Sequence, residues 1–494
     1  MPINHNTVTT QLYINGQYQN AVSGETYPQY NPARPSELVG YAASATVADV
    51  DLACNAARDA MPAWSALSYQ ERAQYLLNIA DHLVNNPEEL QARARLFTRE
   101  HGKILHEAHI EISRISDRFR QVASYAERLS QDETLSGPHY DTIITRQARG
   151  VAALVVPWNW PISILGAKLP QALIAGNCVV VKPSKESALV TALTVGLMAE
   201  MLPPGVINLL TGSSANIGDA LLSHPAIRTI NFTGSVAVGK HVMKVAADNL
   251  VPVTLELGGN DAGIVLADAK LDDAAFKRMY LAAFMSSGQI CMALKRLYVH
   301  RSRYDEVVTG LTQMASAQVI GDGTLATTTM GPLNNKKQLG IVTSMIAEAK
   351  QSGCDVLELG QVPDTALYAE GYFQKPTLVL NPDLNLRVVK EEQFGPVLPI
   401  IPFDSVDEAI HFANDSEFGL CSSVWTEDRD QALRLARRLE AGYTYLNNHG
   451  PLAQDSRAPF GGHKHSGVGR NLGYEGIIAF QEMHSISASE GGLL

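Results

Sequence analysis

Apolar side chains recur at helical spacing in the first fifth of the chain. Within residues 47–67 they stand three or four residues apart, at Val50, Cys54, Ala57, Met61 and Trp64. This spacing places them on one stripe of an α-helix, and that stripe then packs against a core. We therefore predict that the first fifth of the chain is mainly helical.

From Gly150 onward the pattern changes to short apolar runs that are rich in β-branched residues. The runs VAALVV, CVVVK, VINLL and TINFT alternate with helical segments at residues 186–201 and 236–247. Strands that alternate with helices of this length form a parallel sheet with helices on both faces. A nucleotide or dinucleotide site is then expected at the carboxyl ends of the strands.

The same alternation resumes after LELGG and predicts a second α/β unit. Strand-like AGIVLA and RLYVH precede helices that begin at Leu271 and Tyr304. This unit would span about 200 residues, an ordinary domain size. The glycine pair of LELGG offers a hinge between the two units. Residues 130–148 and the tail after Phe480 are polar and extended and lie outside both units.

Composition narrows the class of partner. The 494 residues are 46% hydrophobic and 18% charged, with a formal net charge of -11. A chain of this length exceeds the size at which a single core keeps growing, so at least two domains are expected. Because there is no basic stripe to neutralise phosphates, nucleic acid and anionic membranes are excluded as partners. A small-molecule substrate is favoured instead.

The sequence also argues against a membrane span, a disulfide framework and a metal site. The most apolar stretch, residues 151–181, is interrupted by Pro157, Pro161 and Pro170, which indicates strand, loop and helix. The N-terminal segment has neither the basic leader nor the apolar core of a signal peptide, so a cytoplasmic location is expected. The five cysteines are odd in number and contain no CxxC pair, so neither disulfides nor zinc is predicted.

Three motifs hold residue types suited to covalent chemistry on a carbonyl group. In FMSSGQICMA, Cys291 follows a Gly-Gln turn, where a thiol can be exposed and backbone N–H groups can stabilise its thiolate. In LELGG, Glu256 ends a strand before two glycines, so its carboxylate can project into a cleft. In PWNWP, Asn159 lies at a rigid bend, where its amide can donate to a developing oxyanion. A lone cysteine is more often a core residue, so the three motifs count only together.

The motifs PWNWP, LELGG and GQxC, in this order, resemble the aldehyde dehydrogenase superfamily. Further matching blocks extend over essentially the whole chain: VKPS, FTGS, EEQFGP, ANDSEFGL and PFGGHKHSGVGR. The resemblance implies an α/β fold with a parallel-sheet dinucleotide-binding domain, an α/β catalytic domain and a small extended oligomerisation flap. The cofactor-binding domain would comprise residues 1–129 and 149–257, and the catalytic domain residues 258–455. Residues 130–148 and 480–494 would be the oligomerisation segments.

The resemblance also assigns a mechanism. Cys291 is the expected nucleophile, and the Asn159 amide with the Cys291 backbone N–H is the expected oxyanion hole. The thiohemiacetal gives its hydride to NADP or NAD, and the thioester that remains is cleaved by water that Glu256 activates. The expected reaction therefore converts a small-molecule aldehyde to a carboxylic acid.

Cofactor and substrate residues follow from the same resemblance. The expected cofactor residues are Val156, Trp158, Lys182, Lys185, Gly234, Ser235, Gly239, Leu257, Glu392 and Phe394. FTGS stands where a strand turns into a helix, so its last two residues would face a pyrophosphate at the helix N-terminus. The expected substrate residues are Ile290, Met292 and Phe460, with Trp160 and Leu452 as further candidates. This apolar set favours an uncharged aliphatic or aromatic aldehyde.

Three positions depart from the common family pattern. Ser286 stands where many members have Asn, and Asn260 where many have Lys, both expected near the active-site wall. Lys185 stands where NAD-preferring members carry a Glu that accepts from the adenine ribose. Lys185 can instead pair with a 2'-phosphate, so NADP is expected to serve at least as well as NAD. In the alternative, Lys185 points to solvent and Glu186 takes the ribose, which leaves NAD preferred.

Three other functions were weighed against this one. A CoA-acylating enzyme does not need the carboxylate of Glu256, because a thiol rather than water accepts the acyl group. A catalytically silent relative would have lost at least one of Cys291, Glu256 and Asn159, and all three are present. Esterase chemistry on the same thiol would be a side activity, because the nicotinamide motifs are intact.

The extended segments predict an oligomer. Residues 130–148 and the strand around residues 484–489 lie outside the two α/β units, and the resemblance places such a flap against a partner subunit. There its backbone groups can pair. A homodimer or homotetramer is therefore expected.

Overall fold

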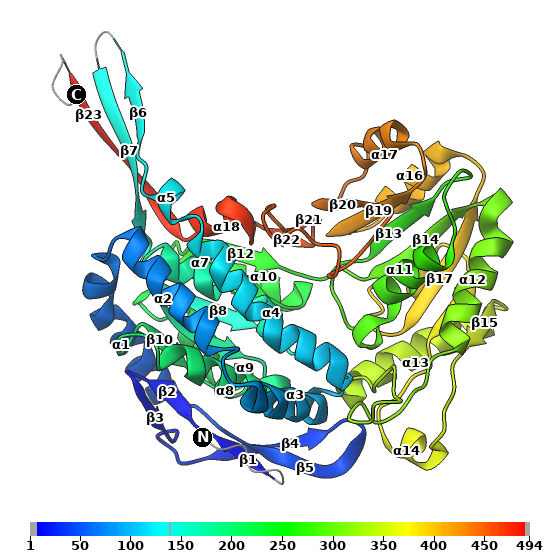
Figure 1. The fold of residues 1–494 in the computed structure, drawn as a ribbon, viewed down its shortest axis with the longest axis horizontal. Helices are drawn as coiled ribbons and strands as arrows, with labels where there is room; N and C mark the ends of the chain where they lie inside the picture. Colours follow the sequence, from blue (N-terminus) through cyan, green and yellow to red (C-terminus); the bar gives the residue numbers. More distant parts are fainter. Residues whose placement is uncertain (1–6, 138–139, 490–494) are drawn as a thin grey trace.

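The computed structural model describes residues 7–137 and 140–489, arranged as two α/β units and a projecting hairpin (Figure 1). The first unit is built on an eight-stranded sheet and the second on a seven-stranded sheet. Both sheets are mainly parallel, so the predicted fold class is confirmed. Residues 1–6 and 490–494 of the predicted domain ranges lie outside the described residues.

The first sheet has the order β22-β12-β11-β8-β9-β10-β2-β3. Its parallel strands are β8 (Val151–Val156), β9 (Cys178–Pro183), β10 (Ile207–Leu209), β11 (Ile227–Thr233) and β12 (Val253–Glu256). Antiparallel strands close both edges, namely β2 (Leu12–Ile14), β3 (Gln17–Gln19) and β22 (Gly467–Val468). The β22 pairing returns a segment near the C-terminus to the edge where Glu256 lies.

Two groups of helices cover this sheet. One group contains α1 (Val47–Ser65), α9 (Ser214–Leu222) and α10 (Val236–Asp248). The other contains α2 (Tyr69–His82), α3 (Pro87–His101), α4 (Leu105–Ala123), α5 (Ala126–Leu129), α6 (Pro161–Gly166), α7 (Leu169–Ile174) and α8 (Ala188–Ala199). A small sheet of β1 (Val8–Thr10), β5 (Arg34–Ala43) and β4 (Thr26–Asn31) lies against α8 and α3.

The second sheet has the order β15-β16-β17-β14-β13-β19-β20. Its strands are β13 (Asp261–Val265), β14 (Leu294–His300), β15 (Asp355–Glu358), β16 (Thr377–Leu380), β17 (Val397–Phe403), β19 (Cys421–Trp425) and β20 (Tyr443–Leu446). Its helices are α11 (Asp273–Phe284), α12 (Tyr304–Ser316), α13 (Lys336–Gln351), α14 (Thr365–Glu370), α15 (Arg387–Lys390), α16 (Val406–Asn414) and α17 (Arg429–Ala436). Short elements β18 (Phe418–Gly419), β21 (His463–Lys464) and α18 (Gly473–Ile478) belong to the connections between the units.

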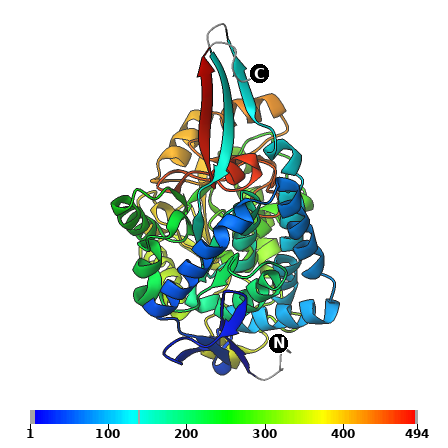
Figure 2. The same cartoon turned by 90° about the vertical axis from the view of Figure 1, so that its left-hand side faces the viewer.

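A three-stranded antiparallel sheet projects from the first unit, and we call it the hairpin (Figure 2). It contains β6 (Glu133–Ser136), β7 (Tyr140–Ala148) and β23 (Gln481–Ser489), with β7 in the middle. Both segments that the sequence marked as extended are therefore strands of one sheet. Its outer strands carry exposed apolar side chains at Leu135, Met483 and Ile486.

The first fifth of the chain, predicted to be mainly helical, is helical only from Val47 onward, because residues 8–43 contain the strands β1 to β5. The helices predicted by residue range agree with the observed ones except at their ends. The helix expected over residues 47–67 is α1, and that over residues 236–247 is α10. The segment expected as one helix over residues 186–201 begins as a 3-10 turn, Lys185–Ser187, and becomes α8 only at Ala188. Within the described residues, no helix is long and apolar enough to cross a membrane.

Candidate active site

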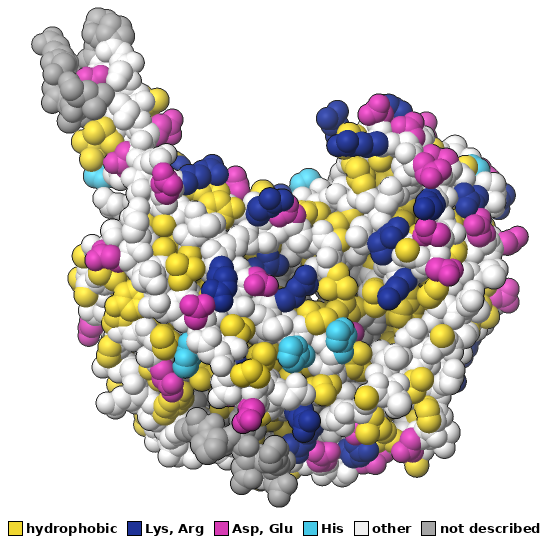
Figure 3. Space-filling view, viewed as in Figure 1, with side chains coloured by type: hydrophobic (Ala, Val, Ile, Leu, Met, Phe, Trp, Pro, Cys, Tyr) yellow, Lys and Arg dark blue, Asp and Glu magenta, His cyan; other side chains and the backbone are white. Residues whose placement is uncertain are grey.

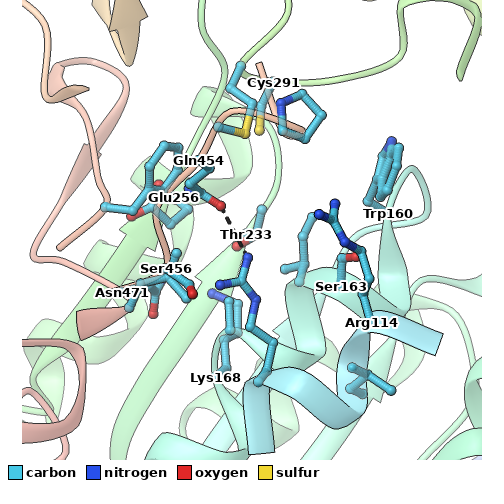
Figure 4. A pocket seen from close by; sticks show the side chains of 18 of the residues that line it. Arg114, Trp160, Ser163, Lys168, Thr233, Glu256, Cys291, Gln454, Ser456 and Asn471 are labelled. Atoms are coloured by element: carbon cyan, nitrogen blue, oxygen red, sulfur yellow. Dashed lines mark hydrogen bonds between the residues drawn. The ribbon is translucent and has the colours of Figure 1, made fainter. Parts of the chain in front are cut away.

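The predicted catalytic residues meet at a cavity of about 250 Å³ (Figure 4). Three neighbouring parallel strands bring side chains to it: Asn159 follows β8, Thr233 ends β11 and Glu256 ends β12. Cys291 reaches the same cavity from the loop that precedes β14 of the second sheet. The cavity thus lies at the carboxyl ends of strands, and both units contribute to it.

The apolar wall consists of the residues that were predicted for the substrate tunnel. Ile290, Met292 and Phe460 line the cavity, together with Trp160 and Leu452. All but Leu452 belong to one cluster of packed apolar side chains that also contacts Cys291. Leu452 is 45% exposed, which places it at the mouth. A hydrocarbon chain that enters the cavity would therefore contact apolar side chains on its way to the thiol.

A tight turn presents Cys291. Ser286, Ser287 and Gly288 have φ angles of 54°, 56° and 72°, all in the left-handed region that L side chains rarely adopt. The turn is held in place by neighbours: Ser286 N donates to Glu107 Oε1 (3.0 Å) and Ser287 Oγ donates to the Gly331 carbonyl (2.8 Å). These bonds offset the cost of the backbone conformation and fix the thiol at the cavity.

The thiol of Cys291 does not have the environment that the sequence predicted. Backbone N–H groups were expected to stabilise a thiolate, but burial raises the pKa of Cys291 to about 12. The Lys295 ammonium lowers this pKa less than burial raises it, and the carboxyl groups of Glu392, Glu256 and Asp261 raise it further. Lys295 Nζ instead donates to the carbonyls of Ile290 (2.7 Å) and Cys291 (2.6 Å). The thiol is therefore protonated at neutral pH in the free chain.

Glu256 and Lys168 face the cavity with shifted pKa values of their own. Burial raises the pKa of Glu256 to about 8, although Lys168 and Arg470 lower it in part. Burial lowers the pKa of Lys168 to about 7. The Lys168 ammonium donates to Asn231 Oδ1, and Asn231 Nδ2 donates to Asn471 Oδ1 (2.7 Å). Two titrating groups near neutrality at one cavity are typical of a catalytic site.

Asn159 has one amide donor engaged and sits on a braced bend. Its Nδ2 donates to the Gln289 carbonyl at 2.9 Å, two residues before Cys291. Lys103 Nζ donates to the Asn159 carbonyl at 3.2 Å and lies 4.2 Å from the centre of the Trp160 ring. Because an amide nitrogen carries two hydrogens, the second can serve an oxyanion beside the thiol.

Two predicted cofactor residues lie at the carboxyl ends of strands β8 and β9. Val156 ends β8, and Lys182 is the fifth residue of β9. The Lys182 ammonium is buried and donates to the Gly212 carbonyl (3.3 Å) and Ser214 Oγ (3.1 Å). Burial lowers the pKa of Lys182 to about 8. This lysine is therefore anchored at the sheet edge and does not extend into solvent.

FTGS forms the predicted turn between β11 and α10. The Ser235 side chain caps α10 by accepting a hydrogen bond from the helix backbone (3.4 Å), and Gly234 N donates to the Glu256 carbonyl (3.1 Å). The first N–H groups of such a helix carry partial positive charge and suit a pyrophosphate. A Cβ atom on Gly239 would lie 2.5 Å from Leu257 Cδ2, so only glycine lets α10 approach the end of β12 this closely.

The remaining cofactor candidates come from the loop before β17. Glu392 Oε1 accepts from Gly259 N (3.1 Å) and lies 3.3 Å from Lys295 Nζ. The Phe394 ring lies edge-on to Trp158, with 5.5 Å between ring centres. These contacts join the loop after β8 of the first unit to the second unit.

Lys185 stands apart from these residues. Its side chain is 58% exposed, and its ammonium lies 3.9 Å from the Glu186 carboxylate. Glu186 in turn accepts a hydrogen bond from Ser184 Oγ. Lys185 and Glu186 therefore both remain available to a ribose or to a phosphate.

Two departures from the family pattern lie behind the cavity wall. Ser286 and Asn260 are both buried, and neither is among the described residues that line the cavity. Asn260 Nδ2 donates to the Val389 carbonyl at 2.8 Å. Their expected place near the wall corresponds to the packing layer behind it, and their bearing on the substrate stays a prediction.

Sequence reasoning missed the cationic side of the cavity. Arg114 and Arg118 of α4 line it, and so does Gln454. Lys168, the single charged residue of the apolar stretch 151–181, lines it as well. The signal that could have identified the arginines is their spacing of four residues, which places both on one face of a helix.

Comparisons with known proteins show the family of the chain. The sequence profile of the aldehyde dehydrogenase family matches residues 18–486. The putative aldehyde dehydrogenase FUS7 of Gibberella fujikuroi is 36% identical over 96% of this chain and 97% of its own. The mitochondrial aldehyde dehydrogenase of Leishmania tarentolae is 36% identical, over 97% and 95% of the two chains.

Solved structures show the same likeness. A putative aldehyde dehydrogenase from Burkholderia cenocepacia has a TM-score of 0.92 at 36% identity and covers 98% of both chains. Betaine aldehyde dehydrogenase from Staphylococcus aureus, in complex with NAD+, has a TM-score of 0.91 at 31% identity, over 98% of this chain and 95% of its own. The chain therefore belongs to the aldehyde dehydrogenase family.

Proposed function

We propose that this enzyme oxidises an aldehyde to the carboxylic acid through a thioester on Cys291, with NAD or NADP as hydride acceptor. The observation that carries the proposal is the meeting of Cys291, Asn159 and Glu256 at one cavity with an apolar wall. These residues come from three separate strand ends and loops. Their convergence supports acyl chemistry on a thiol.

Each residue has one role in this proposal. Cys291 attacks the carbonyl carbon, and the free N–H of the Asn159 amide stabilises the oxygen that becomes negative. The thioester left on Cys291 is cleaved by water, from which Glu256 takes a proton. The pKa of Glu256, about 8, suits a base that must accept a proton near neutral pH and later release it.

The strand-end residues fit a dinucleotide. The capped N-terminus of α10 suits the pyrophosphate, and the anchored Lys182 stands where a ribose hydroxyl would lie. Glu392 and Phe394 lie beside the Cys291 loop, where the nicotinamide ribose and ring would be held. NAD or NADP supplies the hydride acceptor when bound. Lys185 favours NADP, and the half-buried Glu186 keeps NAD as the alternative.

The carbonyl end of the substrate would contact the apolar wall. Met292 and Phe460 surround the thiol, in keeping with the aliphatic or aromatic aldehyde favoured by the sequence. Glu256 favours water over CoA as acyl acceptor. The predicted cytoplasmic location stays a prediction, and the Leishmania relative carries the word mitochondrial in its name.

We also propose that the hairpin joins subunits of a homodimer or homotetramer. Its outer strands expose Leu135 (51%), Met483 (70%) and Ile486 (42%), and among the described residues each outer strand pairs only with β7, so one edge of each stays open. Contact with a second copy would cover both.

The proposed mechanism is tested by removing the nucleophile. Cys291→Ala should abolish aldehyde oxidation, measured as reduced-cofactor absorbance, while cofactor affinity stays within about twofold. Cys354→Ala, at a half-buried cysteine that does not line the cavity, is the matched control and should keep full activity. Glu256→Gln should let the acyl-enzyme accumulate, visible by intact-mass spectrometry. Substantial turnover by Cys291→Ala would overturn the proposal.

A further inference from the structure

Two arginines of α4 stand at the cavity without a carboxylate partner. Arg114 and Arg118 lie one helical turn apart and both line the cavity (Figure 4). The other face of α4, with Ile112 and Phe119, is buried in the core. The helix is therefore fixed by its apolar face, and its arginine face is directed to the cavity.

Their charges are offset only in part by the chain: burial and Arg114 lower the pKa of Arg118 more than Asp117 and Asp455 raise it. Within residues 7–137 and 140–489, no carboxylate lies within 4 Å of either guanidinium, and Arg118 has a single side-chain hydrogen bond, 3.4 Å long, to Gln454 Oε1. By contrast Arg120, two residues further along the same helix and on a different face, pairs with Asp81 at 2.7 Å. Asp117 also lines the cavity, so the three side chains leave an excess of one positive charge.

The surroundings of Arg118 disfavour its positive charge. It is half-buried, and burial lowers its pKa, with the neighbouring charge of Arg114 lowering it further. Burying an uncompensated cation is unfavourable unless an anion joins it. The chain as a whole has a net charge of -11, so a cationic patch here runs against its composition. Figure 3 shows Lys and Arg side chains over this region of α4.

We propose that the substrate is an aldehyde with a carboxylate at its far end, the semialdehyde of a dicarboxylic acid, and that Arg118 and Arg114 bind this carboxylate. The inference rests on the proposed function, because the thiol at the other side of the cavity receives the carbonyl group. Two guanidinium groups suit a carboxylate because each presents paired N–H donors. Between the two ends, the substrate chain contacts Trp160, Met292 and Phe460.

The reaction balances with the cofactor already proposed. The aldehyde carbon loses a hydride to NAD or NADP and gains an oxygen from water, so that a dicarboxylate and a reduced cofactor are formed with release of protons. This inference changes the expectation of an uncharged aldehyde, which considered only the apolar wall. An aldehyde with a quaternary ammonium group would face the same arginines with like charge.

The test compares matched substrates on matched variants. The substrates are succinic, glutaric and adipic semialdehydes, each beside its methyl ester, and kcat/KM is measured with the cofactor in excess. The wild type should prefer the best semialdehyde over its ester by at least about tenfold. Arg118→Met should lower that ratio by about tenfold to hundredfold, the range expected for a charge-assisted hydrogen bond. Arg118→Lys should restore part of it.

Arg120→Gln is the control, because Arg120 belongs to the same helix but does not line the cavity. For Arg120→Gln, the ratio of kcat/KM for the semialdehyde to kcat/KM for its ester should stay within about twofold of the wild-type ratio. Raising the salt concentration should lower kcat/KM for the semialdehyde and leave the ester unaffected.

Equal or better use of the ester by the wild type would overturn the carboxylate proposal, and so would a ratio unchanged in Arg118→Met. Preference for a phosphorylated aldehyde over every semialdehyde would overturn it as well. In each case oxidation of the ester still reports on the mechanism. Failure of the proposed function itself would appear differently, as no oxidation of either partner of any pair.

Discussion

The buried ion pair beneath Asn159 gives a prediction whose size follows from its surroundings. Lys103 and Glu111 are both fully buried and bonded to each other. Lys103 Nζ also donates to the Asn159 carbonyl, and Glu111 Oε1 accepts from the backbone N–H groups of Ile162 (2.9 Å) and Ser163 (3.1 Å). The pair therefore holds both sides of the bend that carries the candidate oxyanion donor.

Lys103→Met removes the cation and leaves a buried carboxyl group. Breaking a buried pair in this way costs about 3–5 kcal/mol of stability. Burial already raises the pKa of Glu111, and Lys103 lowers it. Without Lys103 the pKa of Glu111 rises further in the folded protein. In the unfolded chain Glu111 has its ordinary pKa and loses its proton at a lower pH, so a higher pH favours the unfolded chain. The destabilisation should therefore grow between pH 6 and pH 8.

The substitution should also lower kcat. An oxyanion donor contributes about 2.7–4 kcal/mol to the transition state, so a fully displaced Asn159 would reduce kcat by about hundredfold to thousandfold. Lys103→Met combined with Glu111→Gln removes both charges and keeps an acceptor for the Ile162 and Ser163 N–H groups. We expect this double variant to recover about half of the lost stability.

Stability is measured by urea unfolding at pH 6 and pH 8, at one protein concentration, and kcat by cofactor reduction. Lys350→Met is the control, because Lys350 pairs with Glu358 at the surface, where loss of a pair costs less than about 1 kcal/mol. If Lys103→Met costs no more than this control and leaves kcat unchanged, the pair does not hold the bend.

Three further predictions concern the base, the cofactor and the hairpin. With a Glu256 pKa of about 8, the carboxylate fraction rises from about a tenth at pH 7 to about nine tenths at pH 9, so the deacylation rate should rise with pH over this window. A flat profile, measured by stopped-flow decay of the acyl-enzyme, would exclude Glu256 as the base. Lys185→Glu should shift the ratio of kcat/KM values from NADP toward NAD by about fivefold to tenfold, a modest change because Lys185 is more than half exposed. If the wild type favours NAD more than tenfold and the variant has the same preference, Lys185 takes no part in cofactor choice. Light scattering should return a dimer or tetramer, and Met483→Glu should weaken it; a monomer of about 53 kDa at micromolar concentration would contradict the role of the hairpin.

The fold followed from the sequence because its signals are local. β-branched runs bounded by helices predicted β8, β9 and β11 in their observed places, and one apolar stripe predicted α1. The start of α8 was missed because residues 185–187 form a 3-10 turn first. Two backbone N–H groups near this start, those of Leu189 and Val190, donate to the buried carboxylate of Glu100, more than eighty positions earlier in the chain. A contact with so distant a partner leaves no local pattern.

The electrostatics of the site could not be predicted for the same reason. The pKa of Cys291 depends on burial and on Glu392 and Asp261, which come from other loops. Lys and Glu side chains are usually solvated, so no local pattern indicated that Lys103 and Glu111 are buried together. Nor could periodicity distinguish the Arg118 face of α4 from a solvent-exposed face.

The distribution of charge within the cavity also fixes the direction in which a substrate would bind. At the chemical end, burial disfavours ionisation: the Cys291 thiol is neutral, and Glu256 is protonated below about pH 8. An anion placed there would meet the same desolvation penalty that raises both pKa values. At the mouth, Arg114 and Arg118 carry positive charge that Asp117 and Asp455 offset only in part. A semialdehyde therefore binds with its carboxylate at the arginines and its carbonyl at the thiol, since the reverse orientation would bury the carboxylate beside Glu256 and leave the guanidinium groups without an anion.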